Sequence, residues 1–371
     1  MNFTLLLSTC KDIVAIVAQY LGNKDIIHLT AACSITDQFK HEIVFAKKVK
    51  FDRIAHLSYL HNFRTVEIAY HAERIAIPKT VTQVHYCTDK PYFNSSFANR
   101  ITHLILNDCY KEMVTMLPPL LTHLTFGNRF ANPIGKIIPQ SVTHLVFGKN
   151  FNHSVKDIIP FSVTHLTFGG KFNVPEKDAI PKSVTHLTFG YYFNQCIEGC
   201  IPPSVTHLTF TGKFNQPIRG HIPESVTHLV FGTDFDQSVN DLPSSVTHLT
   251  VDHSFNRVIE DCNSITHLVT NPALKNLPII DIPITHLTLG MYYNRPITDV
   301  IPPTVTHLKF GYHFDQPLDD LPESVTHLTL SECFQQTLNS IQKSVKEIVV
   351  HKSYSQPICV DVLSRVIKND N

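Results

Sequence analysis

The tripeptide Thr-His-Leu occurs twelve times in this chain of 371 residues, and successive copies lie 19 to 21 residues apart. So short and regular a period is typical of a solenoid, because each unit is too small to bury its own apolar side and must stack on its neighbours. We therefore expect one core that extends along the stack, and no compact domain built around a single active site. The motif histidines are His103, His123, His144, His165, His186, His207, His228, His248, His267, His286, His307 and His327.

Composition excludes several classes of partner. Lys plus Arg and Asp plus Glu both number 31, so the chain has no bulk positive charge for nucleic acid or for an anionic membrane. No basic residue precedes the apolar start, and charged or polar residues interrupt the longest apolar stretches, so we expect neither a signal peptide nor a membrane span. Nine scattered cysteines without a C-x-x-C motif indicate buried thiols in a reducing compartment. We predict no nucleic-acid partner, no membrane partner and a cytoplasmic location.

Each repeat contains one stretch with the character of a strand. Val205–Phe210 is rich in β-branched and aromatic residues and is bounded by Pro and Gly, which predicts a strand of about six residues. Leu208 and Phe210 then share one face, and His207 lies on the other. One strand per unit predicts one parallel sheet. The roughly 15 remaining residues are few for a crossover helix, so we expect extended segments with at most single 3₁₀ turns, and a right-handed coil.

An aromatic ring recurs seven positions after the motif histidine. Stacked rings about 4.8 Å apart would form a continuous spine and the main source of stability. The rings are Tyr110, Phe130, Phe151, Phe172, Phe193, Phe214, Phe235, Phe255, Tyr293, Phe314 and Phe334. Leu274 interrupts this series, and we expect a kink in that unit. Asn or Asp often follows the ring, as at Asn215 and Asp236, which indicates a turn side chain that bonds to nearby backbone.

Two roles are open for the histidine column, namely metal binding and support of the fold. A straight row of imidazoles about 4.8 Å apart offers collinear nitrogens and no carboxylate, whereas a selective zinc site needs a closed set of three or four ligands. We therefore predict no metal and no cofactor. Neighbouring like charges would repel, so protonation should be disfavoured and the solenoid should lose stability below about pH 6.

A pair repeated at every rung offers the same chemistry everywhere, so the recognition of a target should depend on positions that vary. These positions lie two residues after the motif histidine and in the turn after the strand. Tyr and Arg are favoured anchors in interfaces. The candidate target-binding residues are Arg129, Tyr191, Tyr192, Tyr292, Lys309 and Tyr312. The alternative is that part of this set consists only of solvated turn residues.

No catalytic motif is evident. His41-Glu42 lacks the second histidine of a zincin helix, and the chain has no G-x-G-x-x-G, G-x-x-x-x-G-K or G-x-S-x-G motif. Serines near the motif histidines recur in most units, which indicates a structural role. We predict that the protein is not an enzyme.

The first 45 residues have a different pattern. Apolar residues recur at helical spacing, as at Ile13, Ile16 and Tyr20, and Asn23 and Asp25 separate two short helices. The residues Leu7, Asp12, Ile13, Ile16, Tyr20, Leu21, Asp25, Ile26, Leu29 and Cys33 resemble the F-box pattern. Ser8 replaces the proline of that pattern, and Phe39 stands near an expected tryptophan.

The F-box resemblance implies that this module docks a Skp-type adaptor and, through it, a cullin. Two amphipathic helices too small to be stable alone suit packing into a partner's groove. The residues expected at the adaptor contact are Leu7, Ile13, Ile16, Leu21, Ile27 and Leu29. The alternative is that the same residues simply cap the first coil.

The repeats resemble the FNIP repeat, a relative of leucine-rich repeats found in amoebae and in the giant viruses that infect them. The resemblance is carried by the run Phe214–Ile218 and by related runs at Phe193 and Tyr293. The asparagine lies beside the ring instead of at its usual leucine-rich-repeat position, so the asparagine ladder of that class need not be present. The implied fold is α+β: a right-handed leucine-rich-repeat-like solenoid with one parallel sheet, preceded by a small helical F-box-like module.

We expect an F-box-like module at 1–45, a linker and N-terminal cap at 46–80, the FNIP solenoid at 81–360 and a tail at 361–371. The resemblances imply a non-enzymatic substrate-recognition subunit of a cullin-RING (SCF-type) ubiquitin ligase, located in the cytoplasm, or in the host cytoplasm if the protein is viral. Two alternatives stay open: a repeat scaffold for protein–protein interaction without a ubiquitin link, and a metal-dependent enzyme.

Overall fold

The computed structural model describes residues 45, 48–58, 60–69, 77–88, 98–260, 262–270, 282–298 and 300–369. The chain divides into two compact units, residues 1–148 and residues 149–371, and each is described by itself. Apart from Phe45, the predicted F-box-like module at 1–45 lies outside the described residues. In the described part of the chain, no helix is long and apolar enough to cross a membrane.

Unit 1 is a stack of parallel strands, each of which pairs with the next along the chain. The strands are β1 (Val49–Lys50), β2 (Thr65–Ala69), β3 (Gln83–Thr88), β4 (Ile101–Leu106), β5 (His123–Thr125) and β6 (His144–Val146). Three 3₁₀ helices lie between them: η2 (Phe51–Arg53), η3 (Leu60–Asn62) and η5 (Ala98–Arg100).

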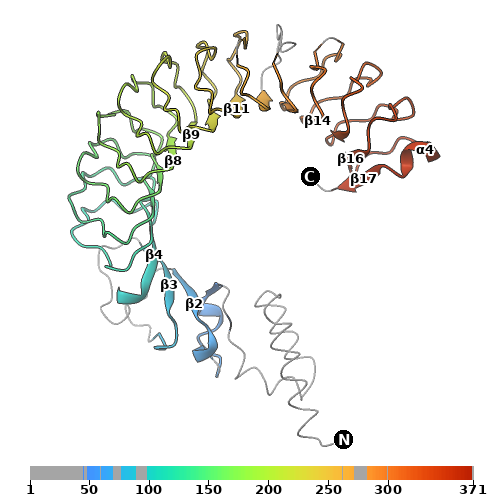
Figure 1. Cartoon of the computed structure of the whole chain (residues 1–371). Helices are drawn as coiled ribbons and strands as arrows, with labels where there is room; N and C mark the ends of the chain where they lie inside the picture. Colours follow the sequence, from blue (N-terminus) through green and yellow to red (C-terminus); the bar gives the residue numbers. More distant parts are fainter. Residues whose placement is uncertain are drawn as a thin grey trace, which may run out of the picture. The chain divides into compact units, whose positions relative to one another are not determined.

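Unit 2 continues the same pattern with one strand per coil (Figure 1). Its strands are β7 (His165–Thr167), β8 (His186–Phe189), β9 (His207–Phe210), β10 (His228–Val230), β11 (His248–Val251), β12 (His267–Thr270), β13 (His286–Leu289), β14 (His307–Phe310), β15 (His327–Thr329), β16 (Glu347–His351) and β17 (Val366–Asn369). Neighbours pair in parallel, and motif histidines face each other across every pair from β7 to β15. The predicted single parallel strand per repeat is therefore confirmed.

Helix is scarce among the described residues. The one α-helix in this part of the chain is α4 (Val360–Leu363), near the C-terminus. The return segments of unit 2 consist of turns and extended stretches, such as the turn closed by Cys200 N–H donating to the Ile197 carbonyl at 3.0 Å. The return segments are too short for a crossover helix, as predicted. The described residues are a parallel β-solenoid, and the helical part of the α+β prediction is not seen in them.

The strands are shorter than predicted. Val205–Phe210 was expected to be extended throughout, but β9 covers only its last four residues. The backbone N–H groups of Thr206 and His207 both donate to the carbonyl of Thr185, at 2.9 and 3.0 Å. Two donors on one acceptor interrupt the regular ladder, so the strand begins at the histidine.

The sheet is longer than the predicted solenoid. Residues 46–80 contribute β1 and β2, which pair in register with each other and with β3. Residues 361–371 contribute β17, in which Val366 lies opposite Ile348 of β16. Neither β2 nor β17 carries the Thr-His-Leu motif, so the period alone did not reveal these strands.

The predicted aromatic spine is present. Each aromatic residue of the predicted series from Phe172 to Phe334 is buried and at most 1 % exposed. In five coils of unit 2 its ring stacks on a second ring at or just after the end of the strand, as Phe214 does on Phe210 at 3.9 Å between centroids. Equivalent pairs elsewhere in unit 2 lie 3.7 to 4.1 Å apart. Both columns fill the interior between the sheet and the return segments.

Ring spacing reveals how the coils fan out. Successive rings of the spine in unit 2 lie 5.9 to 6.4 Å apart, more than the 4.8 Å expected from the strand spacing. Histidine rings on the opposite face of the sheet lie only 4.0 to 4.2 Å apart. Each coil is therefore a wedge, and the strands of unit 2 follow the inner side of its curve (Figure 1).

The repeat expected to form a kink keeps its strand register. In β12, His267 lies opposite His248 on one side and His286 on the other. Thr270 occupies the apolar position at the end of that strand, and its buried hydroxyl has no hydrogen-bond partner in the described residues. Leu274, which interrupts the ring series, lies outside them.

Candidate protein-binding surface

The repeated Thr-His pair builds a hydrogen-bonded ladder on the exposed face of the sheet. In the unit 2 coils from Thr185 to Thr326, each threonine hydroxyl lies 3.2 to 3.4 Å from the carbonyl oxygen of the threonine one coil back. The same hydroxyl lies 2.8 to 2.9 Å from Nδ1 of the histidine that follows it. Both polar side chains are therefore committed to the contact between coils.

Each threonine hydroxyl bridges two neighbours. The Thr206 hydroxyl lies 3.2 Å from the Thr185 carbonyl oxygen and 2.9 Å from Nδ1 of His207. Each imidazole is thus oriented through its Nδ1 atom. A role in support of the coil stack is confirmed for the pair.

Burial and like-charge neighbours both disfavour protonation of the column. Burial, together with the neighbouring histidines, lowers the pKa of His103 and of His248 to about 4. The same two causes lower the pKa of His186, which stacks between His165 and His207 at 4.2 Å on either side. These three histidines are thus uncharged at neutral pH. Among the described residues, no group of three or more His, Cys, Asp or Glu side chains could hold a metal ion.

The histidine column in unit 1 begins one coil earlier than the motif predicts. His85 of β3 stacks on His103 with 3.8 Å between ring centroids, although its strand has no Thr-His-Leu. The register shifts between Val84 and His85, and this shift brings His85 opposite His103. A bulge changes which residue faces its neighbour, so the spacing along the sequence concealed this member.

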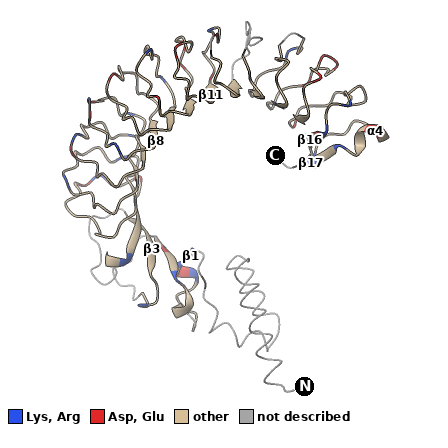
Figure 2. Cartoon of the chain, in the orientation of Figure 1, with Lys and Arg blue, Asp and Glu red and all other residues tan. Residues whose placement is uncertain are grey.

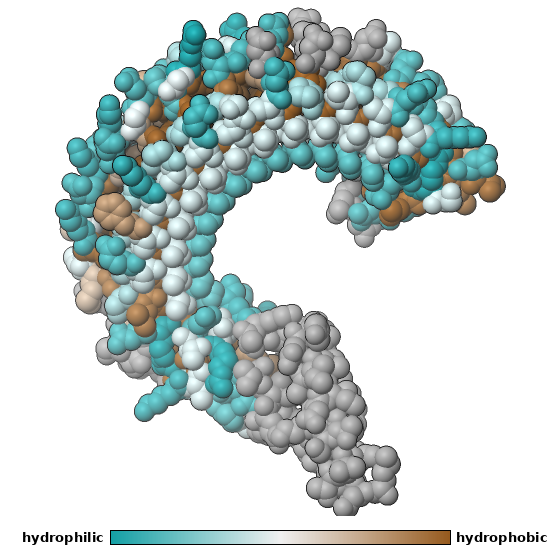
Figure 3. Space-filling view, viewed as in Figure 1, coloured by the Kyte–Doolittle hydropathy of each residue, from teal (hydrophilic) through white to brown (hydrophobic). Residues whose placement is uncertain are grey.

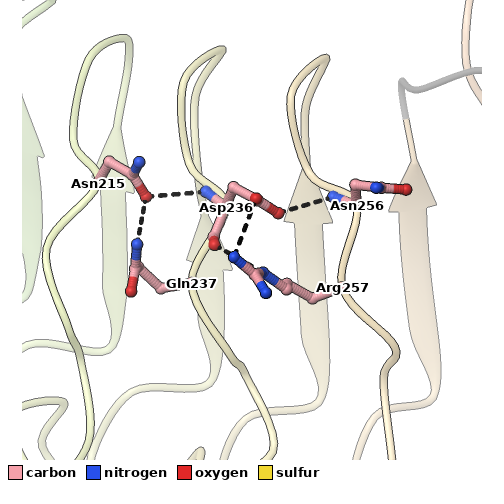
Figure 4. Close-up of polar contacts among 5 residues, drawn as sticks. All are labelled: Asn215, Asp236, Gln237, Asn256 and Arg257. Atoms are coloured by element: carbon pink, nitrogen blue, oxygen red, sulfur yellow. Dashed lines mark hydrogen bonds and ion pairs between the residues drawn. The ribbon is translucent and has the colours of Figure 1, made fainter.

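A second ladder runs along the Asn or Asp positions behind the ring. The side-chain oxygen of Asn215 accepts the backbone N–H of Asp236 at 3.0 Å, and Asp236 in turn accepts the N–H of Asn256 at 3.0 Å (Figure 4). Gln237 adds a bond to Asn215 at 2.8 Å, and Arg257 forms an ion pair with Asp236 at 3.2 Å. These side chains therefore join successive coils instead of bonding only within their own turn.

The turns that directly follow the strands of unit 2 form a varied surface, which we call the turn ridge. Its residues are Lys171, Tyr191, Tyr192, Lys213, Asp234, His253, Met291, Tyr292, Tyr312 and His313. Backbone bonds tie the turns together: Lys213 N–H donates to the Tyr191 carbonyl at 2.7 Å, and His313 N–H donates to the Met291 carbonyl at 3.0 Å. The ridge thus has a fixed backbone and side chains that differ from coil to coil.

The structure separates the predicted target-binding residues into three places. Tyr191, Tyr192, Tyr292 and Tyr312 are exposed on the turn ridge, in two groups. Lys309 lies on the sheet face, where it is the exposed member of β14 between Thr288 and Thr329. Arg129 lies in an exposed turn of unit 1. The predicted adaptor-binding residues Leu7, Ile13, Ile16, Leu21, Ile27 and Leu29 all lie outside the described residues.

Each tyrosine group on the ridge is an ordered cluster. Tyr191 and Tyr192 meet edge to face at 5.0 Å between centroids, and Nζ of Lys213 lies 5.4 Å from the centre of the Tyr192 ring. In the other group, Tyr292 stacks on His313 at 5.5 Å, and Tyr312 meets the same imidazole edge-on at 4.9 Å. Sequence reasoning missed His313, because it considered residues singly; its place beside Tyr312 in a turn was the available signal.

Charge and hydropathy distinguish the two surfaces. The charged residues of unit 2 lie mostly in its loops, and its strands carry few of them (Figure 2). The strand side of unit 2 shows rows of polar and intermediate residues with little apolar surface (Figure 3). Tyr191 and Tyr192 are each 44 % exposed on the ridge. The ridge therefore combines the features that favour protein contacts, namely exposed aromatic rings and local charge.

The return segments of unit 2 carry a hollow and a buried cysteine. A hollow of about 610 Å³ is lined by residues of three coils, including Phe161, Lys182, Cys200 and Pro203. Phe161 at its margin is 79 % exposed. Burial raises the pKa of the Cys200 thiol. Cysteines were expected to be buried, but among the described ones only Cys200 and Cys262 are.

Comparisons with known proteins agree with this architecture. Residues 112–150, 130–171, 172–213, 214–249 and 271–313 match the FNIP Repeat family. No curated protein matches the sequence. Among solved structures, CroV588, described as a novel circular LRR protein, is 31 % identical with a TM-score of 0.65, and the match covers 86 % of this chain and 54 % of CroV588. This chain thus spans about half the length of that protein.

A second solved structure is more distant. YopM from Yersinia enterocolitica WA-314 is 13 % identical with a TM-score of 0.38, over 83 % of this chain and 64 % of YopM. The FNIP matches and the likeness to CroV588, together with the described strands, show a scaffold suited to protein–protein interaction. The chain contains FNIP repeats, and these repeats build a leucine-rich-repeat-like parallel β-solenoid.

Proposed function

We propose that this protein is a non-enzymatic substrate-recognition subunit of a cullin-RING ubiquitin ligase, in which the solenoid holds a target protein. The observation that carries the target-binding half is the turn ridge, whose exposed tyrosines stand on a hydrogen-bonded backbone. Tyrosine is favoured as an anchor because its large ring loses little conformational entropy on binding.

The ligase half is supported by the F-box-like pattern in residues 1–45, from Leu7 to Cys33. The chain continues directly from this segment into the sheet, since Phe45 pairs with Phe63 and their rings stack at 4.5 Å. In this proposal Leu7, Ile13, Ile16, Leu21, Ile27 and Leu29 contact a Skp-type adaptor, which recruits the cullin in the cytoplasm.

The test is co-purification of the full-length chain with a Skp-type adaptor. The variant Leu7→Ala with Ile13→Ala should lose the adaptor and keep its thermal unfolding transition. A matched control replaces two exposed apolar residues at the other end, Val360 and Leu363, by alanine and should keep the adaptor. Equal capture by both variants would reject the adaptor assignment.

A repeat scaffold without a ubiquitin link is the second candidate, and the ridge supports it equally well. The two differ in what residues 1–45 do. A truncated chain for this comparison should begin at Phe45, because removal of β1 and η2 would uncover β2. If this truncation leaves the abundance and ubiquitination of captured partners unchanged, the scaffold is the correct description.

A further inference from the structure

We infer that the ridge cluster of Tyr191, Tyr192 and Lys213, extended by Lys171, binds an acidic, extended segment of the target protein. The inference rests on the proposed function in one respect, namely that the solenoid holds a protein target. It adds the place on the solenoid and the chemistry of what is held there.

The tyrosine pair is held in place before any partner binds. A Cβ atom at Gly212 would lie 2.6 Å from Cδ2 of Tyr191 and 2.3 Å from its carbonyl oxygen, so the Tyr191 ring packs directly over the glycine backbone. Tyr192 meets Tyr191 edge to face, and the Lys213 ammonium lies over Tyr192. A partner therefore meets rings that are already ordered, which reduces the entropic cost of binding.

Two lysines flank these rings in the neighbouring coils. Tyr192 N–H donates to the Gly170 carbonyl at 2.8 Å, and Lys213 N–H donates to the Tyr191 carbonyl at 2.7 Å, so the three turns are contiguous. Lys171 and Lys213 are exposed, and in the described part of the chain no carboxylate forms an ion pair with either. Asp234 in the next coil accepts a bond from the Thr233 hydroxyl at 3.0 Å. The cluster thus carries two positive charges that are not held in ion pairs, and Asp234 borders it in the next coil.

The spacing of the lysines favours an extended acidic ligand. Lys171 and Lys213 are two coils apart, about 10 Å at the usual strand spacing. A peptide in the extended polyproline II conformation rises about 3.1 Å per residue with three residues per turn, so carboxylates three residues apart point the same way and would reach both ammonium groups. The residues between those carboxylates would then lie across the two rings. The strands β7 to β15 offer no such pair, because Lys309 is the one lysine in them.

A nucleic acid is the less suitable partner for the same cluster. Aromatic rings and lysines also bind single strands, but that mode needs a long basic groove along the backbone. Here three exposed lysines, Lys149, Lys171 and Lys213, lie in contiguous turns, Asp234 ends the series, and the positive and negative residues of the whole chain balance at 31 each. So short a row of charges suits a short acidic segment better.

The test measures fluorescence polarisation of a short labelled peptide that has glutamate at every third position and alanine between, with the full-length protein. A peptide with glutamine in place of glutamate is the matched probe. We expect saturable binding of the glutamate peptide that weakens at high salt, and binding of the glutamine peptide at least about tenfold weaker. Failure of the glutamate peptide to bind, or equal binding of both peptides, overturns the inference.

Variants then locate the site. Lys171→Glu with Lys213→Glu, and separately Tyr191→Ala with Tyr192→Ala, should each weaken binding at least about tenfold. The control, Lys182→Glu with Lys343→Glu, makes the same change of net charge at exposed lysines outside the ridge and should bind as the wild type does. An equal loss in the control overturns the inference, as does a single-stranded oligonucleotide that binds the cluster more tightly than the peptide.

The same proteins distinguish this inference from the proposed function. Each ridge variant should still capture the Skp-type adaptor. If peptide binding fails while adaptor capture persists, the ridge assignment falls and the ligase proposal stands. If the adaptor is never captured while the ridge binds the acidic peptide, the ligase proposal falls and the ridge assignment stands.

Discussion

The sheet face and the turn ridge of unit 2 lie on the same coils, yet they use their residues in opposite ways. On the sheet face, the same Thr-His pair recurs, and each threonine bonds both to the coil before it and to its own histidine. On the ridge, the contacts shared between coils are backbone hydrogen bonds, as from Lys213 N–H to the Tyr191 carbonyl. Side-chain contacts there, such as Lys213 over Tyr192, differ from coil to coil. The ridge side chains therefore vary without cost to the stack.

The difference teaches how to interpret repetition within one chain. A side chain that is identical in every coil reports an interaction with the same residue in the next coil, because the register sets like opposite like. A side chain that differs from coil to coil is not constrained in this way. Repeated positions therefore identify what holds the solenoid together, and varied exposed positions are where a partner can be selected.

The largest expected loss of stability comes from removing a ring of the interior. Phe214→Ala removes a ring that stacks on Phe210 within its coil and lies 5.9 and 6.1 Å from Phe193 and Phe235 in the neighbouring coils. We expect a loss of about 3–5 kcal/mol in the free energy of unfolding, measured by chemical denaturation. Phe161→Ala, at an exposed phenylalanine, is the control and should change stability by less than about 0.5 kcal/mol. Similar losses in the two variants would contradict the proposed core.

Acid should weaken the sheet face across many coils at once. The folded-state pKa of His103 and of His248 is lowered from 6.5 to about 4, so between these values the unfolded chain binds more protons than the folded chain. The contribution of these histidines to the free energy of unfolding is then fully present above about pH 6.5. It declines as the pH falls and stops declining near pH 4. We expect a lower melting temperature at about pH 5 than at about pH 7.5. An unchanged melting temperature would contradict the lowered pKa values of these histidines.

The asparagine ladder gives a smaller and more local effect. Asn215→Ala leaves the Asp236 N–H and the Gln237 amide without their acceptor, which should cost about 1–3 kcal/mol. Asn215→Asp keeps an acceptor oxygen, as Asp236 already does for Asn256, and should cost far less. Chemical denaturation of the two variants measures their losses in the free energy of unfolding. Equal losses would mean that the ladder bond contributes little.

Ridge variants should have the smallest effect on stability. Tyr191→Ala with Tyr192→Ala removes exposed rings whose backbone bonds remain, so the free energy of unfolding should change by less than about 0.5 kcal/mol. A matched change in the spine, Phe193→Ala in the same coil, should lose several times more. If the tyrosine pair proves as costly as Phe193, the ridge is part of the fold and not a free surface.

Sequence reasoning predicted those features that depend on period alone. The one-strand repeat, the buried ring seven positions after the histidine and the exposed tyrosines of the turns all follow from local pattern, since alternation along a strand decides which side chains face inward. The structural reading of the Thr-His pair also followed, because a straight row of nitrogens is a poor ligand set. Each of these features repeats within every coil, so each was visible many times.

Features that depend on register between coils were not predictable. His85 joins the histidine column only through a bulge, and β17 pairs with β16 without the motif. The bond from Asp236 to Asn215 connects residues 21 positions apart, and its geometry depends on how the coils fan out. The packing of Tyr191 over Gly212 likewise depends on the close approach of two turns. None of these contacts has a signature within a single repeat.

The most direct test of the account is to compare equal changes on the two surfaces of the same coils. Full-length Tyr191→Ala with Tyr192→Ala alters the ridge, and Thr188→Ala with Thr209→Ala alters half-buried positions on the open face of β8 and of the neighbouring strand β9. Polarisation with the glutamate peptide should show binding weakened at least about tenfold for the ridge variant and within about twofold of wild type for the sheet variant. Loss of binding in the sheet variant with full binding in the ridge variant would contradict the account.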